Sequence, residues 1–208
     1  MNILTDQLPK AIRIGENVYP VNSDFRDCLR IILAFEDNDL TWVEKQFILL
    51  DNLYAEIPPE GDAQDAILKG IKFLNGGEDD KGEDDKGDGD QPTPLRLYSF
   101  NKDAHFIFAA FQQTHGIDLQ NTEYLHWWQF MTLFMDLGSE TMFCNLVGLR
   151  KRIKTGKASK DEKEVAREMG DIISVPEIDT RTVEDKERDR EFLQMVAEAR
   201  KRKKEQVR

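Results

Sequence analysis

The most constraining feature of the chain is an aromatic, mostly apolar stretch at residues 124–137, YLHWWQFMTLFMDL. It contains two adjacent tryptophans, two phenylalanines and two methionines. Its polar residues after Leu125 recur every three or four positions, so on a helix of about 3.6 residues per turn they form one narrow stripe. These residues are His126, Gln129, Thr132 and Asp136. The pattern predicts a helix that is buried on most of its circumference and against which other helices pack.

The tryptophan pair leaves two interpretations open. Adjacent helical residues point about 100° apart, so one indole can fill the core while the other reaches a second surface. Either both indoles belong to the core, or one of them borders a groove for a partner helix beside the polar stripe. The candidate partner-binding residues are His126, Trp127, Trp128, Gln129, Thr132 and Asp136, with Phe192 and Val196 near the C-terminus.

The charge of the chain is strongly negative, with 29 basic and 40 acidic residues and a formal net charge of −11. Residues 150–208 hold 18 of the basic and 14 of the acidic side chains, so the negative excess lies in the first 149 residues. An acidic body argues against nucleic-acid binding, because the phosphate backbone requires a positive surface. No apolar run approaches the roughly 18–20 residues of a membrane helix, and the N-terminus has no secretory pattern, so we expect no membrane contact.

The first elements are a β-hairpin and helices with recognisable start signals. Residues 11–21, AIRIGENVYPV, predict two short strands joined by Gly15-Glu16-Asn17, with Pro20 at a strand edge and helices against the hairpin. Further helices are expected at 25–35, after the N-cap candidates Asn22, Ser23 and Asp24, and from the capping box Thr41–Glu44, with Val43, Phe47, Leu50 and Tyr54 on its apolar side. Three more are expected from Pro58-Pro59 to Asn75, from Ser99 or Asn101 to Gly116, and from Ser139 to Arg152. Another is expected from the capping box Ser159–Glu162 to Gly170.

Two segments interrupt this helical pattern. Residues 77–90, GEDDKGEDDKGDGD, have no apolar side chain to offset the ordering entropy, so we predict a disordered acidic insertion at about 77–93. Calcium binding is the alternative, but the regular ligand spacing of a calcium loop is missing. Residues 172–182 contain Pro176 and no periodicity, which predicts a linker.

Residues 183–208 predict a last helix, acidic at its start and basic at its end, as a helix dipole favours. Its apolar stripe is narrow, so the helix is expected to project or to dock on another surface. The chain therefore divides into a helical domain with a hairpin at 1–175 and a linker with a charged helix at 176–208.

The chain shows no pattern of catalytic residues. His105, His115 and His126 have no cysteine at metal-ligand spacing, although folding could still bring the three together as a zinc site. Phosphate-loop and serine-elbow motifs are missing, and no carboxylate pair occurs in an apolar context. Cys28 and Cys144 lie in apolar helical patterns typical of free thiols in a reducing compartment. We therefore expect no enzyme, no cofactor and no metal.

Four short segments carry a resemblance to a known family. They are NILT at residues 2–5, LP at 8–9, VNSDFR at 21–26 and, most specifically, YLHWWQF at 124–130. In these segments the chain resembles the bacteriophage gene-product-fifteen family of tailed phages and prophages of Gram-positive bacteria. The similarity covers roughly residues 1–175 apart from the tandem GEDDK insertion, and residues 183–208 are less diagnostic.

The resemblance implies a non-catalytic tail-assembly chaperone of a long-tailed phage. Such a protein binds the aggregation-prone tape-measure protein and helps tail-tube subunits gather on it. It acts in the host cytoplasm during infection and is absent from the finished virion. The alternatives are a structural tail or head–tail component retained in the particle, and an enzyme such as a metal-dependent hydrolase. Self-association is a further possibility for any of them.

Overall fold

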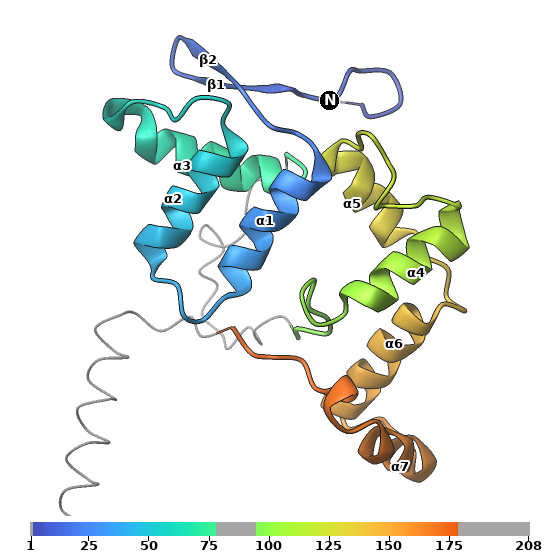
Figure 1. The fold of residues 1–208 in the computed structure, drawn as a ribbon. Coiled ribbons are helices and arrows are strands. Elements are labelled where there is room, and N and C mark those ends of the chain that lie inside the picture. Colours follow the sequence, from blue (N-terminus) through green and yellow to red (C-terminus); the bar gives the residue numbers. More distant parts are fainter. Residues whose placement is uncertain (1, 78–94, 179–208) are drawn as a thin grey trace, which may run out of the picture.

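The computed structural model describes residues 2–77 and 95–178. The chain runs through β1 (Ala11–Ile14), β2 (Asn17–Pro20), α1 (Phe25–Glu36), α2 (Trp42–Leu53), α3 (Glu60–Leu74), α4 (Ala104–His115), α5 (Trp127–Met135), α6 (Met142–Lys154), α7 (Lys160–Met169) and the 3-10 helix η1 (Gly170–Ile173). This order confirms the predicted mainly helical fold with an N-terminal hairpin (Figure 1). The acidic segment from residue 78 onward and the predicted last helix lie outside the described residues.

The hairpin is a two-stranded antiparallel sheet that lies against α3. Its register pairs Ile14 with Asn17, so Gly15 and Glu16 form the loop. Gly15 has a φ of 56°, whereas Asn17, which was expected in the loop, is the first residue of β2 and has no positive φ. Lys69 on α3 donates a hydrogen bond of 2.6 Å to the carbonyl of Arg13. This contact supports the hairpin, which would be marginal alone.

The helices α1 and α5 begin side by side, and this pairing corrects the expected start of the aromatic helix. The N–H of Phe25 donates to the carbonyl of Leu125 at 2.9 Å, and the N–H of Trp127 donates to the carbonyl of Ser23 at 2.7 Å. His126 therefore has an extended backbone and is the N-cap of α5. The helix begins at Trp127, later than the apolar pattern suggested.

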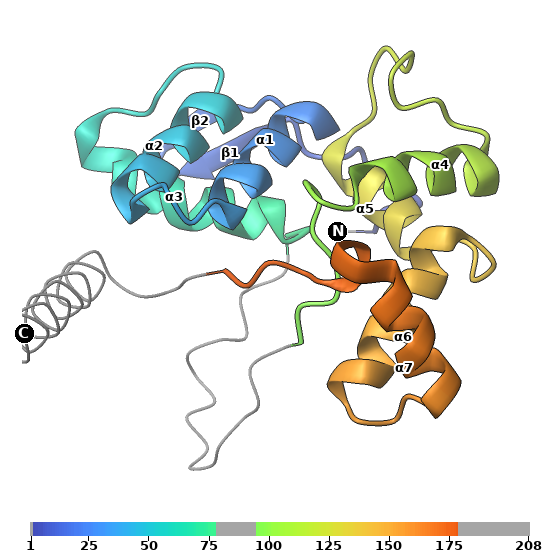
Figure 2. The same cartoon turned by 60° about the horizontal axis from the view of Figure 1, so that its bottom comes forward.

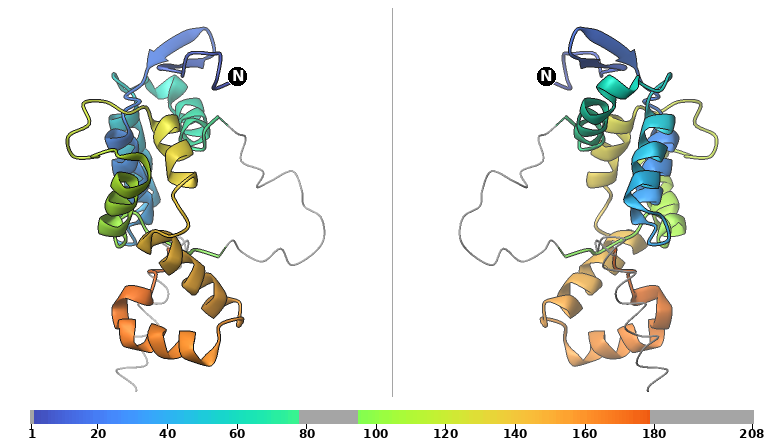
Figure 3. Two further views of the ribbon diagram at one scale, coloured as in Figure 1. Left: turned by 90° about the vertical axis from the view of Figure 1, so that its right-hand side faces the viewer. Right: turned by 90° about the vertical axis from the view of Figure 1, so that its left-hand side faces the viewer.

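The core is an aromatic stack centred on Phe130 of α5. This side chain is fully buried, and its ring stacks with Phe25, Phe111 and Trp127 at centroid distances of 5.1, 4.9 and 5.5 Å. The side views show α1, α2 and α4 on one side of the molecule, and α3 and α5 on the other (Figure 3). Phe25 comes from α1 and Phe111 from α4, so Phe130 of α5 is the point at which the two sides of the molecule meet.

Only half of the apolar side predicted for α2 is covered: Leu50 and Tyr54 are buried, but Val43 and Phe47 are not. Val43 and Phe47 are 72% and 58% exposed, whereas Leu49 and Leu53 are fully buried against α1 and α3. Gly70 of α3 permits this packing, since a Cβ there would lie 2.8 Å from the Leu49 side chain. The helix has apolar residues on two sides, and periodicity alone does not decide which side is covered.

Most helix ends agree with their sequence signals. Both predicted capping boxes form, at Thr41 and at Ser159. Besides α5, two starts differ from the prediction: α6 is capped by Thr141 instead of Ser139, and α4 begins at Ala104 after a turn that starts at Ser99. The α4 start is later because the carboxylate of Asp103 accepts from the N–H of Ser99 and pairs with Arg150.

A buried ion pair holds α6 to the rest of the molecule. Arg150 and Asp103 are each 1% exposed at the side chain and make two hydrogen bonds, of 2.7 and 2.9 Å. The guanidinium also donates to the carbonyls of Leu97, Ile172 and Ile173. The end of the molecule that contains α6 and α7 lies away from α2 and α3 (Figure 2). Residues 174–178, within the predicted linker, have no regular structure but are hydrogen-bonded to the body.

Candidate functional site

His126 is a structural N-cap and does not face a partner. It is 2% exposed, its Nδ1 accepts from the N–H of Trp128 at 3.0 Å, and its Nε2 lies 2.9 Å from the carbonyl of Pro9. Because a carbonyl can only accept, the imidazole is neutral with its proton on Nε2. Burial lowers the pKa of His126, which favours the same neutral form. The prediction that His126 belongs to an exposed stripe is therefore wrong.

Both tryptophans of the pair pack against the end of α3. Trp127 is 1% exposed and its indole N–H donates to the carbonyl of Leu74 at 2.8 Å. Trp128 is half-buried, and its N–H donates to the carbonyl of Phe73, also at 2.8 Å. Gly77 makes room for the second ring, since a Cβ there would lie 2.8 Å from it. The two indoles thus donate to carbonyls in the last turn of α3, where the α-helical pattern of hydrogen bonds ends.

The remaining predicted residues divide into exposed and undescribed ones. Gln129, Thr132 and Asp136 are exposed, as the stripe prediction required. The hydroxyl of Thr132 donates back to the carbonyl of Trp128 at 2.8 Å, so it is engaged within its own helix. Phe192 and Val196 lie outside the described residues.

An apolar groove lies on another side of α5 from the polar stripe, and Trp127, one of the two predicted indoles, lines it. Its volume is about 560 Å³, and its walls come from α1, α3, α5, α6 and the segment that precedes α4. Two residues at the bounds of the described ranges line the groove: Leu95, the first residue of the range 95–178, and Ile178, its last. The main apolar side chains are Ile32, Phe35, Leu74, Leu95, Leu97, Tyr98, Phe100, Trp127, Met131, Val147 and Ile178. We call this surface the apolar groove.

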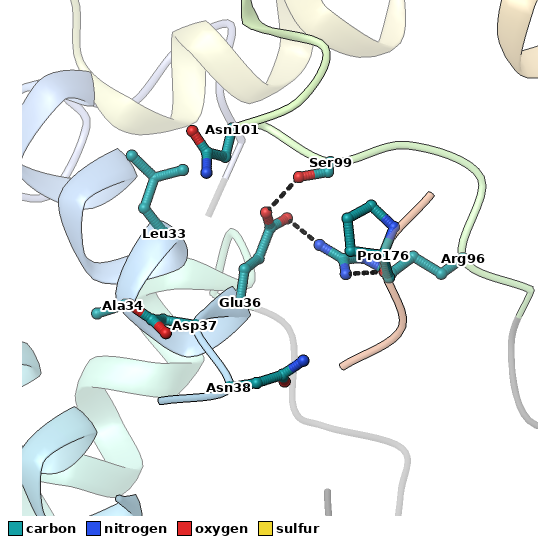
Figure 4. Close-up of a pocket in the computed structure, with 9 residues that line it drawn as sticks. All are labelled: Leu33, Ala34, Glu36, Asp37, Asn38, Arg96, Ser99, Asn101 and Pro176. Carbon is teal, nitrogen blue, oxygen red and sulfur yellow. Dashed lines mark hydrogen bonds and ion pairs between the residues drawn. The ribbon is translucent and has the colours of Figure 1, made fainter. Parts of the chain in front are cut away.

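A polar cluster borders the groove and forms a neighbouring pocket of about 430 Å³. In Figure 4 the carboxylate of Glu36 points between Arg96 and Ser99, with an ion-pair distance of 2.8 Å to the guanidinium and a hydrogen bond of 2.7 Å from the hydroxyl. Arg96 also donates to the carbonyl of Pro176. The two opposite charges neutralise each other, and the cluster fastens two irregular segments to the end of α1. Because these residues lie far apart in the sequence, no local sequence pattern indicates this contact.

The titratable groups of the described residues form no evident reaction centre. His115 contacts the carbonyl of Leu133, and His105 is exposed on α4, so the three histidines have separate surroundings. Within residues 2–77 and 95–178, no three His, Cys, Asp or Glu side chains are placed to hold a metal ion. Cys28 and Cys144 are free thiols, and burial raises the pKa of Cys28 so that it stays protonated. None of the described helices is long and apolar enough to cross a membrane.

The fold places the chain among mainly α-helical proteins with a short β-hairpin and an apolar groove between helices. The sequence matches the family model described as "Bacteriophage Gp15 protein" over residues 4–175. The chain therefore belongs to this family and is a bacteriophage protein. The search of curated proteins and the search of solved structures found no match.

Proposed function

We propose that this protein is a non-catalytic chaperone of phage tail assembly that binds the tape-measure protein. The main support for the proposal is the apolar groove, which occurs here in a member of a phage family. In this proposal the protein acts in the host cytoplasm, keeps its partner soluble until tail-tube subunits gather on it, and is absent from the finished particle.

The groove has the size and chemistry to receive apolar side chains of a partner helix. Its volume of about 560 Å³ lies within the range of specific binding pockets, about 300–1,000 Å³. Most of its lining is half-buried, including Met131 and Val147, so the side chains are held in place yet remain accessible. An amphipathic helix can insert residues spaced three and four apart into such a surface. A long tape-measure protein would offer many helices of this kind.

The charge of the protein suits a chaperone in the host cell. The formal net charge of −11 opposes contact with nucleic acid and keeps the protein soluble while it exposes apolar surface. The edge of the groove carries Glu36 and Arg96, which neutralise each other, so the groove itself favours apolar contacts over ionic ones. Specificity would then come from shape and from residues around the groove.

Co-expression of the tape-measure protein with this chain tests the proposal. With the wild type we expect the tape-measure protein in the soluble fraction, and with Leu95→Glu we expect it to aggregate, because a carboxylate would enter the groove. Leu68→Glu on α3 is the matched control, since Leu95 and Leu68 are 49% and 56% exposed and only Leu95 lines the groove. Equal solubility of the tape-measure protein with and without this chain would refute the proposal.

Mass spectrometry of purified virions separates the proposal from its main alternative. A chaperone that leaves before completion should give no stoichiometric signal. Detection of this chain in a fixed ratio to the tail-tube protein would instead support a structural tail or head–tail component.

A further inference from the structure

The outer side of α2 carries three large apolar side chains that remain at least half exposed among the described residues. Trp42, Val43 and Phe47 are 53%, 72% and 58% exposed. The ring of Phe35 packs edge-to-face with Trp42 at a centroid distance of 5.6 Å, so the indole is held on this surface. The opposite side of α2 packs on α1 and α3. We call the three exposed residues the α2 face.

Acidic residues border the α2 face. Asp37 and Asp39 lie in the turn that leads into the helix, and Asp51 lies one helical turn beyond Phe47; all three are exposed. The one basic residue of α2, Lys45, is turned inward, where its ammonium donates to the carbonyl of Phe35 at 3.1 Å. The surface therefore suits a segment that combines apolar residues with positive charge.

The described chain ends beside this surface. The side-chain amide of Asn38, in the turn before α2, donates to the carbonyl of Glu177 at 3.0 Å. Asn38 and Trp42 are four residues apart and so separated by at most about 14 Å. The chain continues past Ile178 for another 30 residues, which begin within reach of the α2 face.

The sequence of residues 183–208 has the composition that the α2 face requires. On a helical projection Phe192, Met195, Val196 and Ala199 share one side, and a basic run, RKRKK, follows at residues 200–204. The stretch from Ile178 to Phe192 can extend by up to roughly 46 Å, so it does not restrict the approach.

We propose that residues 183–208 dock on the α2 face of the same chain. Phe192 and Val196 cover Trp42 and Phe47, and the basic run lies against the acidic border. Docking removes three large apolar side chains from water, and this gain opposes the entropy of ordering the segment. The inference rests on α2 and on the position of the chain end, and does not depend on the tape-measure proposal.

Acrylamide quenching of Trp42 in the full-length protein tests the docking. Subtracting the signal of a Trp42→Phe variant removes the contribution of the buried tryptophans. We expect slow quenching in the wild type and several-fold faster quenching in Phe192→Glu/Val196→Glu. Gln194→Glu is the control, because it places a carboxylate on the opposite side of the projected helix, and it should quench like the wild type.

A second measurement tests the same contact by a substitution in α2. Phe47→Glu should release the segment and speed tryptic cleavage after residues 200–204 several-fold, whereas Met135→Glu on α5, which is also exposed, should not. Circular dichroism establishes that each variant is folded. Fast quenching of Trp42 in the wild type would overturn the proposal, and so would slow quenching that survives the double substitution. Slow quenching that is lost on dilution would assign the contact to a second copy and would equally overturn docking within one chain.

Discussion

Helices α5 and α2 are both rich in large apolar side chains, but they have opposite surroundings. In α5 the side chain of Phe130 is fully buried among rings from α1 and α4. In α2 the side chain of Phe47 is 58% exposed, because neighbours cover only the other side of the helix. The comparison shows that apolar content alone does not assign a helix to the core; the number of sides that neighbours cover decides it.

The two helices should therefore contribute unequally to stability. Burying a phenylalanine completely contributes about 1.5–3 kcal/mol, and removing it from a packed core costs more because a cavity remains. A side chain that is still mostly in water in the folded state contributes far less. Substitutions in the two helices test this difference.

The largest effect is expected from Phe130→Ala. The substitution would leave a cavity in the aromatic stack and should lower the free energy of unfolding by about 4 kcal/mol. Urea denaturation followed by circular dichroism measures it. Met135→Ala in the same helix is the control, since Met135 is 80% exposed and its loss should be nearly neutral. Similar losses from both substitutions would contradict the assignment of Phe130 to the centre of the core.

Asp103→Ala tests whether the buried ion pair contributes as much to stability as the aromatic stack does. It would leave the Arg150 guanidinium buried without its counter-charge, and we expect a loss of about 3 kcal/mol. The double variant Asp103→Leu/Arg150→Met removes both charges and should recover much of that loss. If the double variant is no more stable than Asp103→Ala, the carbonyl contacts of Arg150 carry the stability instead of the pair.

His126→Asn should have a smaller, pH-dependent effect. Asparagine still caps the helix but loses the contact with Pro9, at a cost of about 1 kcal/mol above neutral pH. Burial lowers the folded-state pKa of His126, so the unfolded chain takes up a proton first as the pH falls through about 6.5. The stability advantage of the wild type should therefore shrink in acid. Urea denaturation of both proteins across this range measures it, and a constant difference would contradict a neutral buried imidazole.

The smallest effect is expected from Phe47→Ser. Exposed substitutions usually change stability by less than about 0.5 kcal/mol, and Phe47 is 58% exposed in the described fold. Losing the proposed contact with residues 183–208 would release a segment without opening a cavity in the core. A thermal melt beside the wild type measures the difference. A loss comparable to that of Phe130→Ala would show that Phe47 belongs to the core and not to a surface on which a segment docks.

The sequence predicted the local structure well, because the signals for helix ends are themselves local. Thr41 and Ser159 form capping boxes with the glutamate three residues later, and a glycine follows both α4 and α7. Each of these contacts lies within one turn of the chain, so the residue types alone indicate it. The hairpin loop at Gly15 is of the same kind.

The candidate site was predicted only in part, because it depends on contacts between distant residues. The sequence identified α5 as the important helix but favoured its polar stripe, whereas the apolar groove lies along Trp127 and Met131. It placed His126 on an exposed helix surface, although pairing with α1 makes this residue a buried cap. The Glu36–Arg96 contact beside the groove joins residues 60 positions apart, and no local pattern points to it.

By itself, the sequence determined the helical class, the hairpin, most helix ends and the phage family, since each follows from neighbouring residues or from recognisable motifs. Tertiary structure decided which side of each helix is covered. Leu49 and Val43 both lie on α2 and are both apolar, yet one is fully buried and the other is 72% exposed. The physical reason is that burial depends on the elements that pack around a residue, and those elements are brought there by distant parts of the chain.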